Sequence, residues 1–395
     1  MKEVAQAYVE LAFALEQHLP GYIDGYFGPD EWKVTEKRAL DGLEQGAQAL
    51  AEKVGGLEDA SRRTFLAAQV RAMQTSIKLL QGSDVPYSEE VRGLYDVAAE
   101  RVPEAVFEEA IADLDDLLEG SGDIAEREQA LRAKLVVPKE KLAEVSDAIA
   151  TELRRRTRKR FPLPEGESFE LKLVEGKPWG GYNWYLGDFR SRIDINTDLP
   201  SYLTGLPNLL AHEIYPGHHT EHALKEAELL KEKGHLEHSL LLINAPECVV
   251  SEGIATWALE VLMSEDEVSD WLADELAPPL DIDGEEVRRA LAVSRAKKDL
   301  RGVSGNAALL LYEEKLSETE VVAYLERYAL RKPEEARKTI EFLTYPTSRS
   351  YSFTYTAGYD LLEPLLKSDD ADTWFRRLLQ EPVTPGVIRG WHTQV

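Results

Sequence analysis

The chain has 395 residues, of which 43% are hydrophobic and 30% charged, so it can bury the core of one large globular domain or of two lobes. Its formal net charge is -26 and its sequence pI about 4.8, which argues against non-specific binding to nucleic acid or anionic membranes, because both need a positive surface. A single cysteine, Cys248, excludes an intramolecular disulfide.

The sequence predicts no membrane segment and a cytoplasmic location. Its first residues enter an amphipathic pattern without an apolar signal core. The longest apolar run, from Ser239 to Val250, is too short to cross a bilayer and contains Asn244 and Glu247. We expect Cys248 to be a small buried residue, since no basic neighbour activates its thiol.

Residues 1–160 predict an N-terminal helical lobe. Apolar residues recur at intervals of three and four, bounded by glycines and prolines, which indicates helices over residues 2–19, 30–54, 66–80, 103–117 and 138–160. The last of these helices ends in a run of arginines between Arg154 and Arg160. In so acidic a chain we interpret this run as a solvated, salt-bridged face that complements the helix dipole.

Residues 161–395 predict a second lobe, which begins with a small antiparallel sheet over about residues 168–197. Apolar residues alternate with period two over residues 169–174, 182–186 and 190–195, and turn residues separate the first two segments. An edge strand here would lie beside the helix that follows, where an extended peptide can pair with it.

The segment from Leu209 to His222 carries the strongest indication of chemistry. It holds four of the eight histidines, and His212 is followed directly by Glu213. A helix that ends in His-Glu is typical of zinc hydrolases, in which the histidine binds the metal and the glutamate acts as general base. The sequence therefore predicts a Zn2+ site, with His212 as a ligand and Glu213 as a catalytic residue.

The second histidine does not stand at the usual position four residues later, which is Pro216. In an unbroken helix His218 would lie roughly 9 Å along the axis and about 120° around from His212, too far for both to bind one zinc. A break at Pro216-Gly217 would return His218 to the ligand position, so we predict His218 as the second ligand. His219 is a second possibility, and the pair His218 and His222 a third.

The third ligand and the remaining catalytic groups are predicted further along the chain. Residues 225–238 form a charged connection, and residues 240–262 an apolar helix that contains Glu252. A buried carboxylate is costly unless it is paired or binds metal, so Glu252 is the predicted third ligand, with Glu247 as the alternative.

Helices are expected over 281–301 and 307–343. Beyond them Arg349, Tyr351 and Tyr355 are predicted to donate to a developing oxyanion.

The string from His212 to His219, followed by Ser251-Glu252-Gly253 and Tyr355-Thr356-Ala357-Gly358, resembles the bacterial family called domain of unknown function 885. Members of that family look like zincins, distantly similar to the thimet oligopeptidase and carboxypeptidase Taq metallopeptidases. The resemblance covers about Tyr182 to Gly358. It implies a mostly α-helical, zincin-like fold with a deep cleft, one zinc held by His212, His218 and Glu252, Glu213 as base and Tyr355 as transition-state donor.

The resulting hypothesis is a zinc-dependent hydrolase, expected to be a metallopeptidase that cleaves small peptides. A non-catalytic helical protein with a structural metal is an alternative, in which His219 or His222 would close the fourth position. A third is a metal-dependent amidase or esterase that acts on a small non-peptide substrate. The sequence does not specify the oligomeric state or the side-chain preference.

Overall fold

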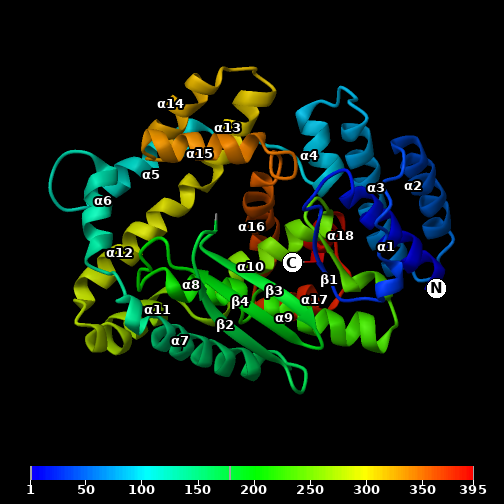
Figure 1. The fold of residues 1–395 in the computed structure, drawn as a ribbon. Coiled ribbons are helices and arrows are strands. Elements are labelled where there is room, and N and C mark those ends of the chain that lie inside the picture. Colours follow the sequence, from blue (N-terminus) through cyan, green and yellow to red (C-terminus); the bar gives the residue numbers. More distant parts are fainter. Residues whose placement is uncertain (1, 178, 395) are drawn as a thin grey trace.

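The computed structural model describes residues 2–177 and 179–394 and confirms a mostly α-helical fold. Figure 1 shows the N-terminal helices on one side of the molecule and α12–α15 on the other, with α10 and α16 between them. Among the described residues, no helix combines the length and apolar character needed to cross a bilayer.

The N-terminal helices pack around their own apolar cluster. They are α1 (Lys2–Glu16), α2 (Leu40–Gly55) and α3 (Ala60–Leu80). The second helix begins ten residues later than predicted from residue 30, because Asp30–Trp32 form only a 3-10 turn and the buried Trp32 ties that turn to the cluster. Leu240, Leu242 and Ala245, far along the chain, complete this first cluster.

All later helices share a second, larger apolar cluster. Before the sheet these are α4 (Tyr87–Tyr95), α5 (Glu104–Leu117), α6 (Ile124–Ala133) and α7 (Lys139–Arg160). After it come α8 (Leu206–Glu213), α9 (His218–Lys225), α10 (Pro246–Leu262), α11 (Glu265–Asp270), α12 (Gly284–Ala296), α13 (Val303–Tyr312), α14 (Glu318–Tyr328), α15 (Pro333–Thr344), α16 (Ser352–Leu366), α17 (Ala371–Gln380) and α18 (Pro385–Trp391). The predicted lobe boundary at residue 160 therefore lies within this second cluster.

The three predicted strands form one sheet, but it is mixed rather than antiparallel. They are β2 (Ser168–Val174), β3 (Gly181–Gly187) and β4 (Arg190–Asn196), in the order β2-β4-β3. The last two form an antiparallel hairpin, whereas β2 runs parallel to β4. Strand β4 lies in the centre of the sheet because its Ile193 and Ile195 are buried, whereas β2 alternates between half-buried and exposed residues.

Two further differences from the predicted elements lie close to the site. A two-stranded antiparallel sheet joins β1 (Ile23–Tyr26) to β5 (Leu240–Leu242), segments too short to show a period along the sequence. The expected charged connection after residue 225 is instead a π-helical continuation of α9 over Glu226–Glu232. Its Glu226 is buried because the Tyr185 hydroxyl and the Asp188 and Phe189 amides donate to its carboxylate.

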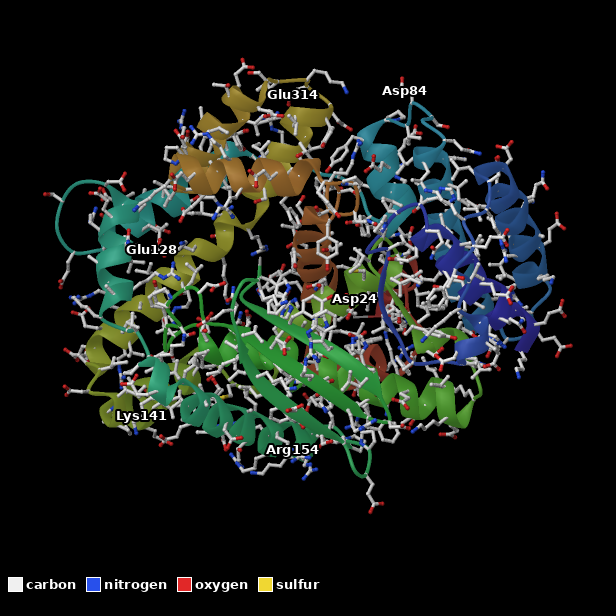
Figure 2. All side chains as sticks on the ribbon, viewed as in Figure 1. Asp24, Asp84, Glu128, Lys141, Arg154 and Glu314 are labelled. Carbon is white, nitrogen blue, oxygen red and sulfur yellow. The ribbon has the colours of Figure 1, made fainter. Side chains whose placement is uncertain are left out.

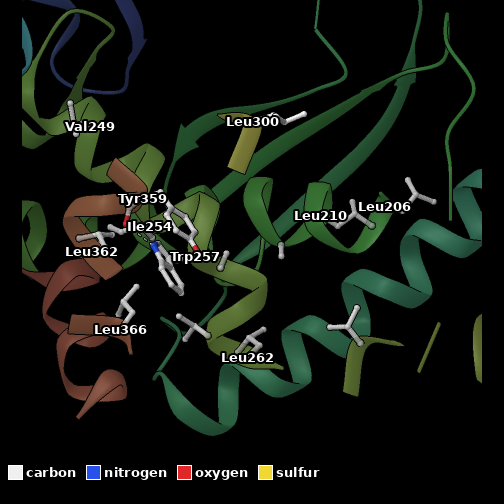
Figure 3. Close-up of a cluster of buried hydrophobic side chains, with 14 of the residues drawn as sticks. Leu206, Leu210, Val249, Ile254, Trp257, Leu262, Leu300, Tyr359, Leu362 and Leu366 are labelled. Carbon is white, nitrogen blue, oxygen red and sulfur yellow. Dashed lines mark hydrogen bonds between the residues drawn. The ribbon is translucent and has the colours of Figure 1, made fainter. Parts of the chain in front are cut away.

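Two glycines bring α10 and α16 into backbone contact. A Cβ on Gly253 would lie 2.8 Å from the Gly358 carbonyl oxygen, and one on Gly358 would lie 2.6 Å from the Val249 carbonyl oxygen. Next to this crossing Trp257 stacks on Tyr359 at 4.3 Å and donates to its carbonyl, as Figure 3 shows. The glycines of the Ser-Glu-Gly and Tyr-x-x-Gly strings thus let the helix that carries Glu252 approach the helix that carries Tyr355.

Candidate metal centre

The predicted break in the histidine segment is present. Helix α8 ends at Glu213 and α9 begins at His218. Between them the chain folds back so tightly that the Gly217 amide donates to the Ala211 carbonyl at 2.9 Å. A Cβ on Gly217 would lie 1.9 Å from the His212 carbonyl oxygen, so no other residue fits this turn without moving the backbone.

The break brings His212, His218 and Glu252 together. His212 Nε2 lies 3.6 Å from Glu252 Oε2, and His218 Nε2 lies 3.9 Å from Glu252 Oε1. Ligands bound at about 2.1 Å around a tetrahedral zinc lie about 3.4 Å apart, so these separations are close to those of a metal site. The two imidazole planes are nearly perpendicular, with ring centroids 4.7 Å apart.

The two imidazoles also have the protonation state that a metal requires. Burial lowers the pKa of His218 to about 4 and holds that of His212 well below its usual range, so both imidazoles are neutral. Glu252 Oε2 is buried and accepts no hydrogen bond from any described residue. A carboxylate whose two oxygens each face a neutral imidazole, and one of which accepts no hydrogen bond, fits a divalent cation.

A chain of hydrogen bonds behind His218 fixes its orientation. Its Nδ1 lies 3.1 Å from the Ser251 hydroxyl, which donates to Glu221 at 2.5 Å. Glu221 in turn accepts from Lys225 Nζ at 2.7 Å, and Ser251, Glu221 and Lys225 are all buried. Because the serine proton is committed to Glu221, the serine oxygen accepts from Nδ1 and leaves the Nε2 lone pair toward Glu252.

Glu213 lies beside the two histidines, as predicted. Ligand atoms of His212, Glu213 and His218 lie within 4.8 Å of one another, so geometry alone also permits Glu213 as a ligand. We assign the third ligand to Glu252 instead, because it faces both histidines and has the orphaned oxygen. Burial, with the charges of Glu252 and Asp24, raises the pKa of Glu213 to about 8.

The two predicted tyrosines line the same cavity but differ in their contacts. The Tyr351 hydroxyl donates to Glu252 Oε1 at 2.7 Å, so it holds the predicted third ligand. Tyr355 is 44% exposed, its ring lies 5.5 Å from that of Tyr351, and it also lines the cavity. Burial raises the pKa of Glu252 and the hydrogen bond from Tyr351 lowers it. Burial is the larger effect, so the pKa is about 7.

Arg349 does not lie in the site. Its guanidinium pairs with Glu90 at 2.9 Å and lies 4.3 Å above the Tyr312 ring, in the wall of a neighbouring cavity of about 640 Å³. Arg349 is close to Tyr351 in the chain, but its side chain points into the neighbouring cavity and away from the metal centre. There the buried carboxylate of Glu90 compensates its charge.

The other two histidines of the segment have separate environments. His219 is fully buried, and its ring nitrogens lie 2.8 Å from the Ser191 hydroxyl and 3.2 Å from Glu167 Oε2. Both nitrogens are therefore engaged away from the cavity, so the geometry favours His218 over His219 as the ligand. His222 lines the cavity, with its ring parallel to that of His218 and 5.9 Å from it.

A second group of metal-ligating side chains occurs in the N-terminal cluster but is a poorer cation site. His235, Glu237 and His238 offer ligand atoms within 4.8 Å of one another. The Glu237 carboxylate already binds the Arg62 guanidinium with both oxygens, at 2.5 and 2.8 Å. A divalent cation here would face the positive charge of that arginine.

The site opens into a cavity of about 390 Å³ between the β1-β5 sheet, strand β3 and α10. Sequence reasoning missed one carboxylate in its wall, Asp24 of β1, which accepts a hydrogen bond from the Tyr182 hydroxyl. Figure 2 places Asp24 near the centre of the view. Nothing in the sequence around Asp24 marks it, because its place depends on the pairing of β1 with β5, more than two hundred residues away.

Comparison with known proteins shows the fold alone. No family model matches the chain, and no curated protein sequence matches it. The crystal structure of a candidate lipoprotein from Colwellia psychrerythraea has a TM-score of 0.54 at 16% identity, over 90% of this chain and 70% of that chain. A candidate lipoprotein of unknown function from Shewanella oneidensis has a TM-score of 0.49 at 12% identity, over 90% and 72% of the two chains.

Proposed function

We propose that the protein is a zinc-dependent hydrolase, most specifically a metallopeptidase that acts on short peptides. The observation that carries this proposal is the convergence of His212 and His218 on the two oxygens of Glu252, with Glu213 beside them. In support, the cavity volume of about 390 Å³ lies within the range of small-molecule sites.

In this proposal His212, His218 and Glu252 hold the zinc. When bound, zinc polarises the substrate carbonyl and increases the acidity of a water molecule. Glu213 accepts a proton from the attacking water as its oxygen bonds to the carbonyl carbon. The carbon–nitrogen bond then breaks and Glu213 passes the proton to the leaving amine. The Tyr355 hydroxyl, exposed to the cavity, donates to the developing oxyanion, while Tyr351 holds Glu252.

The Glu213→Gln variant tests this proposal. We expect zinc content to remain stoichiometric by atomic emission, whereas peptide turnover falls by about 10²- to 10⁴-fold through loss of the base. Glu232→Gln, the same change at an exposed position at the end of the π-helical segment, should leave turnover unchanged. Undiminished turnover in Glu213→Gln would remove Glu213 from the mechanism, and less than one zinc per wild-type chain after repletion would end the proposal.

The same site chemistry also hydrolyses non-peptide amides and esters, so a substrate panel must include them. A structural metal site closed by His222 is the other alternative, because that ring lies in the cavity beside His218. His222→Ala would then release the metal, whereas in the hydrolase it should leave the zinc content stoichiometric.

We further propose a cytoplasmic location, in keeping with the single cysteine. The Colwellia protein is a candidate lipoprotein, so the location needs a direct test. Fractionation of cells should recover the protein with the cytosol, and recovery with the envelope would contradict this part of the proposal.

A further inference from the structure

The charge of the cavity restricts which end of a peptide it can accept. Four carboxylates line it, those of Asp24, Glu213, Glu247 and Glu252. Among the described residues that line the cavity there is no lysine or arginine. Such a wall attracts a cationic group and repels an anionic one.

Three of these carboxylates already have assigned partners. Glu213 and Glu252 belong to the metal centre, and Glu247 Oε1 lies 3.3 Å from Lys225 Nζ. Asp24 accepts from the Tyr182 hydroxyl, and no ion pair to it is found among the described residues. A carboxylate has about four acceptor positions, so Asp24 can accept further hydrogen bonds from a ligand.

Asp24 is also close enough to the metal centre to act on the same substrate. It lies on β1 beside β3, whose Tyr182 donates to it, and it lines the same cavity as Glu213 and Glu252. Burial raises the pKa of Asp24 itself, and a bound ammonium group would offset this cost of burying its charge.

Two further observations bear on the charge of the groups that the cavity binds. Glu252 lines this cavity and is only 7% exposed, and its Oε2 has no hydrogen-bond donor among the described residues, as expected for a site that binds cations. The nearest predicted anion-binding group, Arg349, is instead held by Glu90 at 2.9 Å and lines the neighbouring cavity. A peptide's C-terminal carboxylate therefore finds no guanidinium in the site.

From this arrangement we infer that Asp24 binds the free α-ammonium group of a peptide, so that the enzyme removes residues from the N-terminus. The inference rests on the proposed hydrolase function. A charge-assisted hydrogen bond between ammonium and carboxylate would set the distance from the peptide's N-terminus to the scissile bond. Recognition of the ammonium group by a carboxylate distinguishes this site from one that binds the C-terminus of a peptide, because a site for a C-terminal carboxylate requires a fixed cation.

Three forms of one peptide test the inference: tetra-alanine with free ends, with an acetylated N-terminus, and with an amidated C-terminus. We expect acetylation to lower kcat/KM by about tenfold or more, because it removes the charge that pairs with Asp24. Amidation should change kcat/KM by less than about threefold. Equal cleavage of the acetylated and free peptides, or loss of cleavage on amidation, would overturn the inference.

The Asp24→Asn variant assigns the effect to this residue. It should reduce the difference between free and acetylated tetra-alanine to about threefold or less, mainly through KM for the free peptide. Asp116→Asn, the same charge change at an exposed position on α5, should keep the full preference. A preference that survives in Asp24→Asn would show that another group recognises the amine.

Binding to Glu213→Gln protein separates this inference from the proposed function. Calorimetry should give weaker binding of N-acetyl tri-alanine than of tri-alanine by about tenfold, even if no peptide is ever hydrolysed. Hydrolysis without this difference in affinity would contradict the role of Asp24 and leave the hydrolase intact. The difference without hydrolysis would contradict the hydrolase and leave amine recognition intact.

Discussion

Ser251 has a role that its small side chain does not suggest. Its hydroxyl links His218 Nδ1 to the Glu221 carboxylate, and this link selects the imidazole tautomer with a free Nε2 lone pair. We predict that Ser251→Ala lowers zinc affinity by about 10- to 100-fold, the usual effect of losing a hydrogen bond behind a metal ligand. Competition with a chromophoric chelator measures this. Ser121→Ala, at an exposed loop position, should leave the affinity unchanged, and the same affinity in both variants would contradict the role of Ser251.

Which site residues could be predicted depended on where their signal lies in the chain. His212, Glu213 and His218 share one short segment, so the chemistry of their residue types was sufficient to identify them. Asp24 joins them only through strand pairing across most of the chain, and no local pattern encodes that pairing. The prediction that Arg349 lies in the site was wrong for the complementary reason. A local pattern indicates which residues are close in the chain, but not the direction in which a side chain points.

At the scale of elements, the crossing of α10 and α16 positions Glu252, the proposed third ligand. We predict that Gly358→Ala destabilises the protein by about 1–3 kcal/mol, because its Cβ would meet backbone atoms of α10 that can move only with the helix. Gly42→Ala, in α2 with no neighbouring atom within 4 Å, should instead stabilise by about 0.5–1 kcal/mol. Denaturant unfolding of both variants measures these changes, and a neutral Gly358→Ala would contradict the close contact.

Glu167, just before β2, ties α7 to the histidine segment. Its buried carboxylate accepts from Arg154 at 2.6 Å, from Tyr215 at 2.5 Å and from His219 at 3.2 Å. Burial raises its pKa, but the hydrogen bonds from His219, Tyr215 and Arg154 outweigh burial and lower it to about 2. Because the pKa is lower in the folded state than the usual 4.5, this contribution to stability is present above about pH 4.5 and is lost as the pH falls toward 2.

We therefore predict that Glu167→Gln costs on the order of 2 kcal/mol at pH 7, a value reduced for the partial solvation of the arginines, and less than half as much at pH 3. Denaturant unfolding of wild type and variant at both pH values measures the difference. Glu165→Gln, at an exposed position two residues away, should show little difference at either pH. A Glu167→Gln cost that does not shrink in acid would contradict the lowered pKa.

The helices were easier to predict than the strand order for a physical reason. Helix α7 extends over Lys139–Arg160, against the predicted 138–160, because its apolar residues recur within one continuous segment. The order β2-β4-β3 depends instead on which strand buries most apolar surface against the helices, so the burial of Ile193 and Ile195 decided it. The alternating pattern predicted the three strands but not their partners.

At the scale of the whole molecule, the proposed metal centre lies where the two apolar clusters meet. The predicted ligands come from α8, α9 and α10, and α10 contacts α3 of the first cluster as well as α4, α16 and α17 of the second. The first cluster is completed by residues of β5 and the segment before α10. A bound cation would therefore restrain the segment that joins both clusters, and not only the helices that carry its ligands.

We predict from this position that zinc stabilises the whole chain against unfolding. A ligand that binds only the folded state contributes about 4 kcal/mol when its free concentration is about 1,000 times Kd. Unfolding followed by the fluorine NMR signal of fluorotryptophan at the buried Trp32 of the first cluster, assigned among the seven tryptophans with Trp32→Phe, should then shift to higher denaturant on zinc repletion. His218→Ala should remove most of this shift, whereas His18→Ala, outside both clusters, should keep it. Zinc could instead raise the denaturant concentration at which the second cluster unfolds without changing the unfolding midpoint of the Trp32 signal. The two clusters would then unfold independently, and this prediction would be wrong.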